Sequence, residues 1–257
     1  LNFRVVQNCL VRFPSLHLAF ASCLGYLDPH TQSPYIDPRM SFKAYIRKFP
    51  LYQKMRKWDA ARRQKGRDEV ADWERKGCPV PPPHLVKQRE IKTLAEEYGV
   101  KVFIETGTLY GDMIEAMKPY FDQLYSIELS ESLYERACER FSGEDKVRII
   151  QGDSAVELGK LMSEITGPAM FWLDGHYSAG DTARGVKDTP IYEELNHIFN
   201  HSPNGHVIMI DDAHCFESDP AYPSLDEIRG FILGQCPDVT VEVKCNSIRI
   251  LPAKQSA

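Results

Sequence analysis

The segment from Val102 to Gly111 constrains the fold more than any other part of the chain. It has the pattern of a short apolar strand that ends in an acid, Glu105, and runs into a turn that contains Gly107. A second apolar strand ends in another acid, Glu128. Glycines let a backbone approach a ligand closely, and an acid after the second strand can accept hydrogen bonds from a ribose diol. The pattern predicts the start of an α/β domain that binds a nucleoside.

Strand and helix patterns alternate after this point, at a spacing typical of a parallel sheet with helices on both faces. The expected strands are Val102–Glu105, Gln123–Glu128, Val147–Gln151, Ala169–Asp174 and His206–Ile210. The expected helices are Leu85–Tyr98, Gly111–Lys118, Ser132–Phe141, Ala155–Thr166 and Pro190–Asn200. Two last apolar stretches, Val239–Lys244 and Ser247–Leu251, are joined by only two residues, which predicts an antiparallel hairpin.

A proline-rich stretch at 78–83 favours a stiff, extended connector. We therefore expect residues 1–80 to form a basic, mostly helical extension and residues 81–257 to form the α/β domain. Between Lys43 and Lys76 there are 12 Lys and Arg against 5 Asp and Glu, a local charge of +7 in a chain of net charge −5. Such a run is either a solvated helical face or an arm for an anionic partner, such as a polysaccharide or a membrane surface. No recognisable nucleic-acid-binding module accompanies it, so specific nucleic-acid binding is not expected.

The seven cysteines are scattered and form no C-x-x-C pair, which favours a reducing, cytoplasmic compartment and no structural zinc. The apolar stretch near Leu16–Leu24 is shorter than the roughly 20 residues of a transmembrane helix and has no clear cleavage site. The 257 residues suit one catalytic domain with an extension, and a homo-oligomer is compatible with the sequence. The first residue is Leu1 rather than methionine, which leaves open that the chain is a fragment.

Acidic residues stand at the carboxyl ends of all five expected parallel strands, where open α/β sheets bind their ligands. They are Glu105, Glu128, Asp153, Asp174 and the pair Asp211-Asp212. An acid in this position often only caps a helix, and Asp153 directly precedes one. The same position after the third strand also suits a hydrogen bond to an adenine amino group.

Several short blocks of sequence resemble those of the class I S-adenosylmethionine-dependent methyltransferases. They are Glu105-Thr106-Gly107-Thr108 with Gly111-Asp112-Met113, Ser126 to Glu131, Gly152-Asp153-Ser154, Phe171 to Ser178, Asp188 to Leu195, and Ile210 to Ala213. The resemblance covers about 150 residues and leaves the N-terminal third unexplained. It implies a Rossmann-like α/β fold, with a mostly parallel seven-stranded sheet whose last strand is antiparallel, and an activity of class EC 2.1.1.

The resemblance also implies S-adenosyl-L-methionine as the cofactor. In that family the turn after the first strand lies against the methionine part, the acid after the second strand holds the ribose, and the residues after the third strand flank the adenine. The matching residues here are Glu105, Thr106, Gly107, Thr108, Gly111, Glu128, Asp153 and Ser154, with Asp174 at the same edge.

An NAD-dependent enzyme on a similar sheet is one alternative. The usual NAD motif G-x-G-x-x-G brings a helix amino end against a pyrophosphate, whereas a sulfonium needs no phosphate cradle. Here Leu109 replaces the middle glycine, and the acid Glu105 two residues before Gly107 favours a cationic or amino-bearing ligand. Many methyltransferases also have a glycine at the position of Leu109, so this residue departs from their pattern as well.

Asp174, Asp211 and Asp212 would repel one another at adjacent strand ends unless they are protonated, hydrogen-bonded or neutralised, and Mg²⁺ is the natural candidate for neutralising them. The arrangement is similar to that of metal-dependent O-methyltransferases that act on catechols and antibiotic sugars. There the metal binds two substrate oxygens and lowers the hydroxyl pKa. Alternatively, the aspartates only cap a turn and orient the loop that follows Asp174.

His176 is the preferred general base, with Asp174 beside it, because Gly175 allows the backbone to present the imidazole to the cleft. His214 is the other candidate. The polar segment 177–185 has the pattern of a substrate loop, in which Arg184 either meets an anionic group or pairs within the loop.

The favoured function is therefore methyl transfer to an oxygen of a small polar acceptor, such as a sugar or a glycan precursor. The alternative from a different class is a non-catalytic nucleoside-binding module. Its basic arm would dock it to a glycan-assembly complex or to a membrane.

Overall fold

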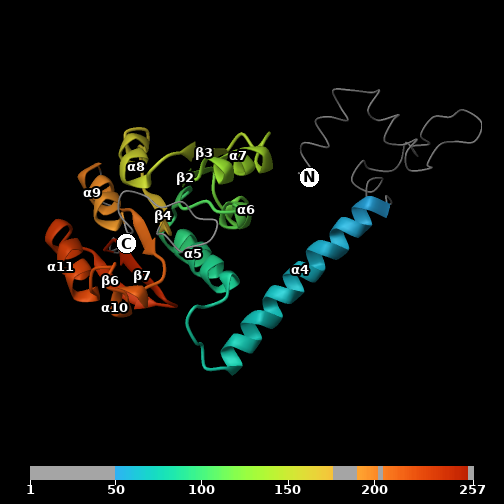
Figure 1. Cartoon of the computed structure of the whole chain (residues 1–257), viewed down its shortest axis with the longest axis horizontal. Coiled ribbons are helices and arrows are strands. Elements are labelled where there is room, and N and C mark those ends of the chain that lie inside the picture. The colour runs from blue at the N-terminus through green and yellow to red at the C-terminus, as the bar shows by residue number, and fades with distance from the viewer. Residues whose placement is uncertain (1–49, 176–189, 202–204, 254–257) are drawn as a thin grey trace, which may run out of the picture. The chain divides into compact units, whose positions relative to one another are not determined.

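The computed structural model describes residues 50–175, 190–201 and 205–253 (Figure 1). The chain divides into two units, Leu1–Asp68 and Glu69–Ala257, and the boundary falls inside helix α4 (Pro50–Arg75). The sequence pattern placed the division after residue 80, at the proline-rich connector. That division into domains stays a prediction.

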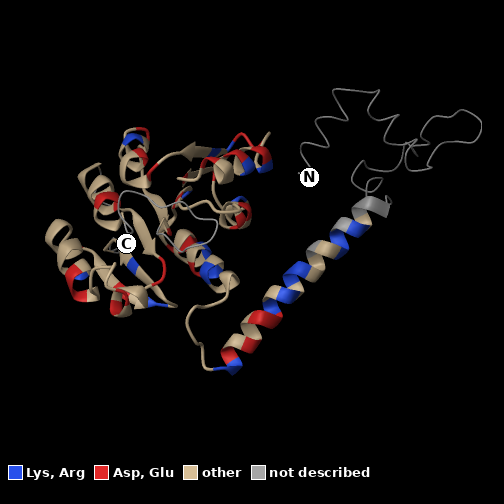
Figure 2. Cartoon of the chain, viewed as in Figure 1, with Lys and Arg blue, Asp and Glu red and all other residues tan. Residues whose placement is uncertain are grey.

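Helix α4 is one continuous helix of 26 residues within the segment that the sequence predicts to be mostly helical. Pro50 suits its first position, because proline has a helical φ and the first amide needs no partner. Most of its described side chains are exposed, although Val70 is buried, and Figure 2 shows Lys and Arg along its length, with acids gathered toward Arg75. None of the helices in the described ranges combines the length and the apolar character needed to span a bilayer.

Seven strands form one mixed sheet in the order β3-β2-β1-β4-β5-β7-β6. They are β1 (Val102–Thr106), β2 (Gln123–Glu128), β3 (Val147–Gln151), β4 (Ala169–Leu173), β5 (Val207–Ile210), β6 (Thr240–Lys244) and β7 (Ser247–Leu251). Neighbouring strands among β1 to β5 are parallel, while β7 is antiparallel to β5 and β6. The predicted fold class is confirmed, and each strand end lies within one residue of the expected one.

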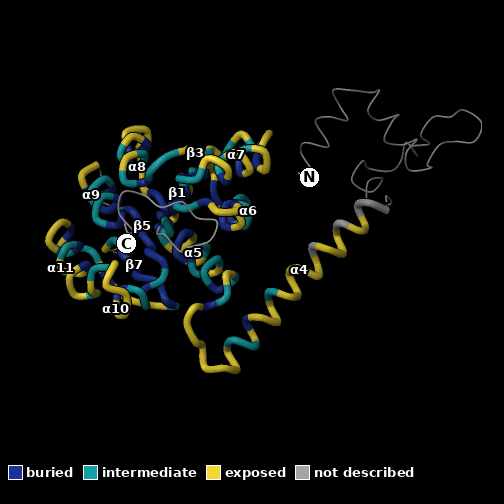
Figure 3. Tube along the Cα trace, in the orientation of Figure 1, coloured by how far each residue is buried: buried dark blue, intermediate teal, exposed yellow. Residues whose placement is uncertain are grey.

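Side chains of the central strands alternate between two apolar cores, as the period of two in a strand requires. Phe103 and Trp172 pack on the side of α5 (His84–Tyr98), α6 (Asp112–Met117) and α7 (Glu131–Arg140). Ile104 and Phe171 pack on the side of α8 (Ser154–Met162), α9 (Ile191–His201) and α11 (Leu225–Gln235). Figure 3 shows the resulting layers, with buried strands between helices whose outer faces are exposed.

Two helices between β5 and β6 were not expected from the sequence, α10 (Cys215–Ser218) and α11. Helix α11 begins with a capping box, in which Ser224 and Glu227 satisfy each other's backbone amides. Ile228 and Ile232 follow one turn apart and are both buried. The capping box and the four-residue spacing of the isoleucines are sequence signals of a helix start, and the expected helices above did not include them.

Candidate functional site

The strand order places the acidic residues in a row along the carboxyl edge of the sheet. Because β1 to β5 are parallel, their carboxyl ends meet at one edge, where this class of sheet binds ligands. Along that edge the order is Asp153, Glu128, Glu105, Asp174, and then Asp211 with Asp212. The topology, rather than the order in the chain, makes Glu105 the central acid of the row.

The turn after β1 depends on left-handed backbone at three positions: Gly107 (φ +84°), Leu109 (φ +49°) and Gly111 (φ +74°). A Cβ on Gly107 would lie 2.5 Å from the carbonyl oxygen of Asp174, so only glycine fits there. Leu109 adopts the conformation that favours glycine. The backbone at Leu109, where many methyltransferases have a glycine, therefore has the left-handed conformation that glycine adopts most readily.

Glu128 connects this turn to the end of β2. Its Oε2 accepts a hydrogen bond from the backbone amide of Leu109 at 2.8 Å, and its Oε1 accepts one from the amide of Ser130 at 2.9 Å. The residue is 5% exposed. A carboxylate can accept about four hydrogen bonds, so both oxygens keep capacity for a ribose diol.

Glu105 lies in a buried chain of hydroxyl contacts and is 2% exposed. The hydroxyl of Ser126 donates to Glu105 Oε2 at 2.7 Å, and the hydroxyls of Thr108 and Ser126 lie 2.6 Å apart. Burial raises the pKa of Glu105 well above its usual range, and the carboxylates of Asp174 and Glu128 add to the rise, while the Ser126 hydrogen bond partly offsets it. Glu105 therefore needs a proton or a cationic partner. Thr106 beside it is fully buried.

Asp153 caps helix α8, since its side chain accepts a hydrogen bond from the amide of Ala155 at 3.0 Å. Ser154 is the first residue of that helix and is buried. The capping interpretation of Asp153 is thus confirmed. A contact of Asp153 and Ser154 with adenine stays a prediction.

A lysine that the sequence analysis did not single out contacts the predicted metal ligands. The ammonium of Lys87, in the first turn of α5, pairs with Asp211 Oδ2 and lies 3.6 Å from Asp212 Oδ1. Their side chains are 12% exposed for Lys87 and 1% for Asp211. Burial lowers the pKa of Lys87, but Asp211, Asp212 and Asp174 together raise it by more, so its net pKa is above the usual value.

This arrangement does not fit the predicted Mg²⁺ site at Asp174, Asp211 and Asp212. Asp212 Oδ1 also accepts a hydrogen bond from the Asn246 amide at 3.1 Å. A divalent ion about 4 Å from the Lys87 ammonium would be repelled by roughly 8 kcal/mol at an effective dielectric of about 20, which offsets a large part of its attraction to the aspartates. No group of three or more His, Cys, Asp or Glu in the described ranges is placed to hold a metal ion.

The predicted general base, His176, and the segment 177–185 with Arg184 lie outside the described residues. His214 is described, and both its backbone amide and its Nδ1 contact Asn246 Oδ1, at 3.1 and 3.0 Å. His214 therefore has a structural partner at the turn after β5.

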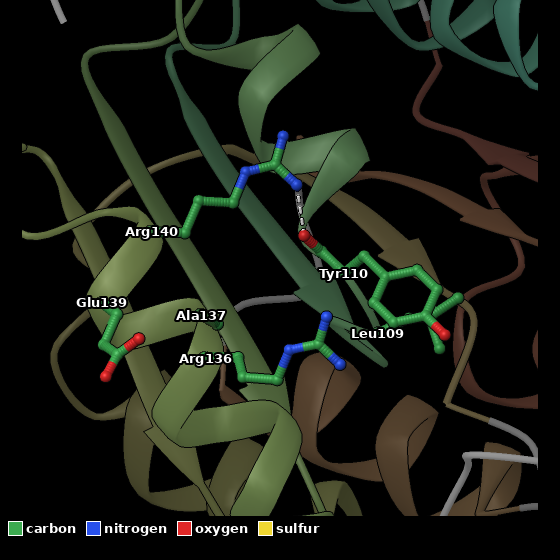
Figure 4. A pocket seen from close by; sticks show the side chains of 6 residues that line it. All are labelled: Leu109, Tyr110, Arg136, Ala137, Glu139 and Arg140. Atoms are coloured by element: carbon green, nitrogen blue, oxygen red, sulfur yellow. Dashed lines mark hydrogen bonds between the residues drawn. The ribbon is translucent and has the colours of Figure 1, made fainter. Parts of the chain in front are cut away.

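A pocket of about 460 Å³ opens between the turn after β1 and helix α7 (Figure 4). The Arg140 guanidinium donates to the carbonyl of Tyr110 and lies 3.0 Å from the Asp112 carboxylate. Arg136 lies 5.1 Å from the centre of the Tyr110 ring. The full lining is Leu109, Tyr110, Arg136, Ala137, Glu139 and Arg140. Both arginines are exposed helix residues, and no local sequence signal links them to the turn.

Solved structures of similar proteins include the O-methyltransferase TomG from Streptomyces achromogenes, involved in tomaymycin synthesis, in complex with SAM. It is 19% identical over 73% of this chain and 88% of that chain, with a TM-score of 0.50. An O-methyltransferase from Bacillus cereus in complex with SAH is 17% identical over 72% and 89%, with a TM-score of 0.49. The SAH-bound methyltransferase PaMTH1 from Podospora anserina is 15% identical over 66% and 78%, with a TM-score of 0.46.

No protein-family model and no curated protein matches the sequence. The similarity to TomG shows the fold, which is the class I methyltransferase fold with its antiparallel seventh strand.

Proposed function

We propose that this chain is an S-adenosylmethionine-dependent methyltransferase that acts on an oxygen of a small polar acceptor, such as a sugar or a glycan precursor. The observation that carries the proposal is the contact between Glu128 and the left-handed turn at Leu109, at the carboxyl edge of a sheet with this strand order. TomG, which has the same fold, is an O-methyltransferase in complex with SAM.

The donor set at the edge suits this cofactor. Glu128 would accept hydrogen bonds from the ribose, Asp153 from the adenine amino group, and Glu105 would face the cationic methionine part. A row of carboxylates with one buried acid of raised pKa favours a ligand that carries positive charge. When bound, the cofactor supplies a methyl group on a sulfonium, which is an electrophile.

Helix α6 supports this cofactor over NAD. A helix that binds a pyrophosphate presents its positive amino end to the phosphates. The first turn of α6 instead carries two acids, Asp112 and Glu115. Both acids are ion-paired, Asp112 with Arg140 and Glu115 with Lys118, and they reduce the positive charge that this helix start offers to a diphosphate.

The acceptor hydroxyl must lose its proton as the new oxygen–carbon bond forms. We assign this proton to the imidazole of His176, because the residue directly follows Asp174 and Gly175 at the carboxyl end of β4. The assignment of a sugar-like acceptor rests on the resemblance to sugar-modifying methyltransferases. The scattered cysteines support a cytoplasmic location for the reaction.

The test of the cofactor is a thermal-shift measurement with S-adenosylhomocysteine and, separately, with NAD. A ligand at about 100 times its dissociation constant adds about 2.7 kcal/mol to the stability of the folded state. We expect S-adenosylhomocysteine to raise Tm and NAD to leave it unchanged. Pure folded protein that does not respond to S-adenosylhomocysteine would exclude the proposal.

Two matched variants test whether the Tm shift comes from ligand binding at Glu128. Glu128→Ala should lower the affinity for S-adenosylhomocysteine by about tenfold or more, since it removes the ribose acceptor. Glu131→Ala, three residues away on the exposed start of α7, should bind as the wild type does. Binding without methyl transfer to any hydroxylated sugar would favour the non-catalytic alternative.

A further inference from the structure

We propose that the Lys87 ammonium takes the place of a divalent cation at the carboxyl edge, so that methyl transfer at this site uses no metal ion. The catalytic meaning of this inference rests on the proposed function. The exclusion of the metal does not, because it can be measured without cofactor or acceptor.

The position of Lys87 is fixed by the helix that carries it. Helix α5 starts directly after Pro83 and packs against the sheet through Ile91 and Leu94, which are buried. One turn after Lys87, Glu90 pairs with the guanidinium of Arg249, a buried residue of β7. Two ion pairs on one face of α5 therefore connect it to the end of β5 and to the middle of β7, and they hold the backbone of Lys87 beside Asp211.

The ammonium of Lys87 already supplies a positive charge to these carboxylates, while the second oxygen of Asp211, Oδ1, is buried and has no hydrogen-bond partner among the described residues. One oxygen of Asp211 is paired with Lys87, and Asp212 Oδ1 is shared between the ammonium and the Asn246 amide. The side chains of Lys87 and Asp211 are almost entirely buried, so water screens their interaction little. The repulsion among the aspartates, which led us to expect Mg²⁺ from the sequence, is relieved by a cation that the chain itself supplies.

The replacement changes which acceptors the site can use. A divalent ion binds two substrate oxygens at once and so selects acceptors with adjacent oxygens. An ammonium group donates single hydrogen bonds and does not chelate. Lys87 would therefore present a fixed positive charge to one acceptor hydroxyl, and a vicinal diol would not be required.

The test is a titration of the full chain with Mn²⁺. Binding is measured as the decrease of the free-ion signal in electron paramagnetic resonance. The wild type should bind no stoichiometric Mn²⁺, whereas Lys87→Ala should gain one site and bind at least about tenfold more tightly. Adding Asp211→Asn to Lys87→Ala should remove the new site. Lys92→Ala is the matched control, since Lys92 lies on the same helix and contacts the exposed Glu96 and the ring of Tyr120 rather than the aspartates.

Stoichiometric Mn²⁺ binding by the wild type would overturn the inference, and this arm needs no variant to fold. Failure of a folded Lys87→Ala variant to gain a site would overturn it too, because the aspartates would then not be a metal site that lysine replaces. In the activity arm, methyl transfer by the wild type should be unchanged by a chelator. Loss of activity on chelation, restored by Mg²⁺, would contradict the inference while leaving the proposed function intact.

Discussion

Glu105 and Glu128 show, at the scale of single residues, how one side-chain type acquires different chemistry at neighbouring strand ends. Glu128 accepts hydrogen bonds from two backbone amides and fixes the turn after β1. Glu105 accepts a hydrogen bond from the Ser126 hydroxyl inside the sheet and has a raised pKa because it is buried. Glu128 therefore fixes the shape of the turn, whereas the protonation state of Glu105 can change when a ligand binds.

We expect Glu105→Gln to stabilise the ligand-free protein at pH 8 by roughly 1–3 kcal/mol and to weaken S-adenosylhomocysteine binding. The folded-state pKa of Glu105 is raised, so the folded state keeps its proton at pH values where the unfolded state has lost it. Stability is therefore lost as pH rises from the usual value of 4.5 through the raised pKa. Urea unfolding of wild type and variant at pH 5 and pH 8 measures the difference, and equal pH slopes would show that Glu105 is not the titrating group.

His206 should make the stability depend on pH in the opposite direction to Glu105. Its Nδ1 accepts the Ala169 amide at 3.1 Å, and burial, with a smaller effect of His201, lowers the pKa of His206 to about 4. The unfolded state then binds the proton first, so stability falls as pH drops from about 6.5 to 4, by up to about 3 kcal/mol. His206→Asn keeps an acceptor but cannot titrate. The variant should lose less stability than the wild type between pH 7 and pH 4.5 in urea unfolding.

At the scale of elements, the helix caps decide where the site residues lie. Asp153 both caps α8 and stands at the proposed adenine position, and serine substitution separates these roles. Asp153→Ala should cost about 1 kcal/mol of stability, whereas Asp153→Ser should restore most of it because serine is a good cap. Both variants should bind S-adenosylhomocysteine about tenfold more weakly if the carboxylate meets the adenine. If calorimetry gives Asp153→Ser the same affinity for S-adenosylhomocysteine as the wild type, Asp153 is a helix cap and does not contact the adenine.

The elements themselves were largely predictable, because strand and helix periods are local. The apolar runs of β1, β2 and β4 and the two-residue hairpin connection identify their strands without any tertiary information. Helix α11 shows where that approach stops. The sequence contains the capping box and the two isoleucines, but Gly230 and Gly234 lower the helix propensity of the same segment.

At the scale of the whole molecule, both apolar clusters of the sheet consist of residues that follow residue 90. We therefore expect a chain that begins at Glu69 to fold cooperatively and to bind S-adenosylhomocysteine as the full chain does. Thermal unfolding and calorimetry of the shortened chain test this. An aggregated or non-cooperative product would show that the first unit is needed for folding, against the predicted division near residue 80.

Spacing within a few residues is enough to predict the strands, the glycine turn and an acid at the end of each parallel strand. The group that neutralises those acids depends on contacts between distant parts of the chain. Lys87 reaches Asp211 across 124 positions of the chain, through the packing of α5 on β5, and no local pattern records that contact. The sequence could show that a cation was required beside the aspartates, but only the arrangement of helix and sheet shows that the chain provides one.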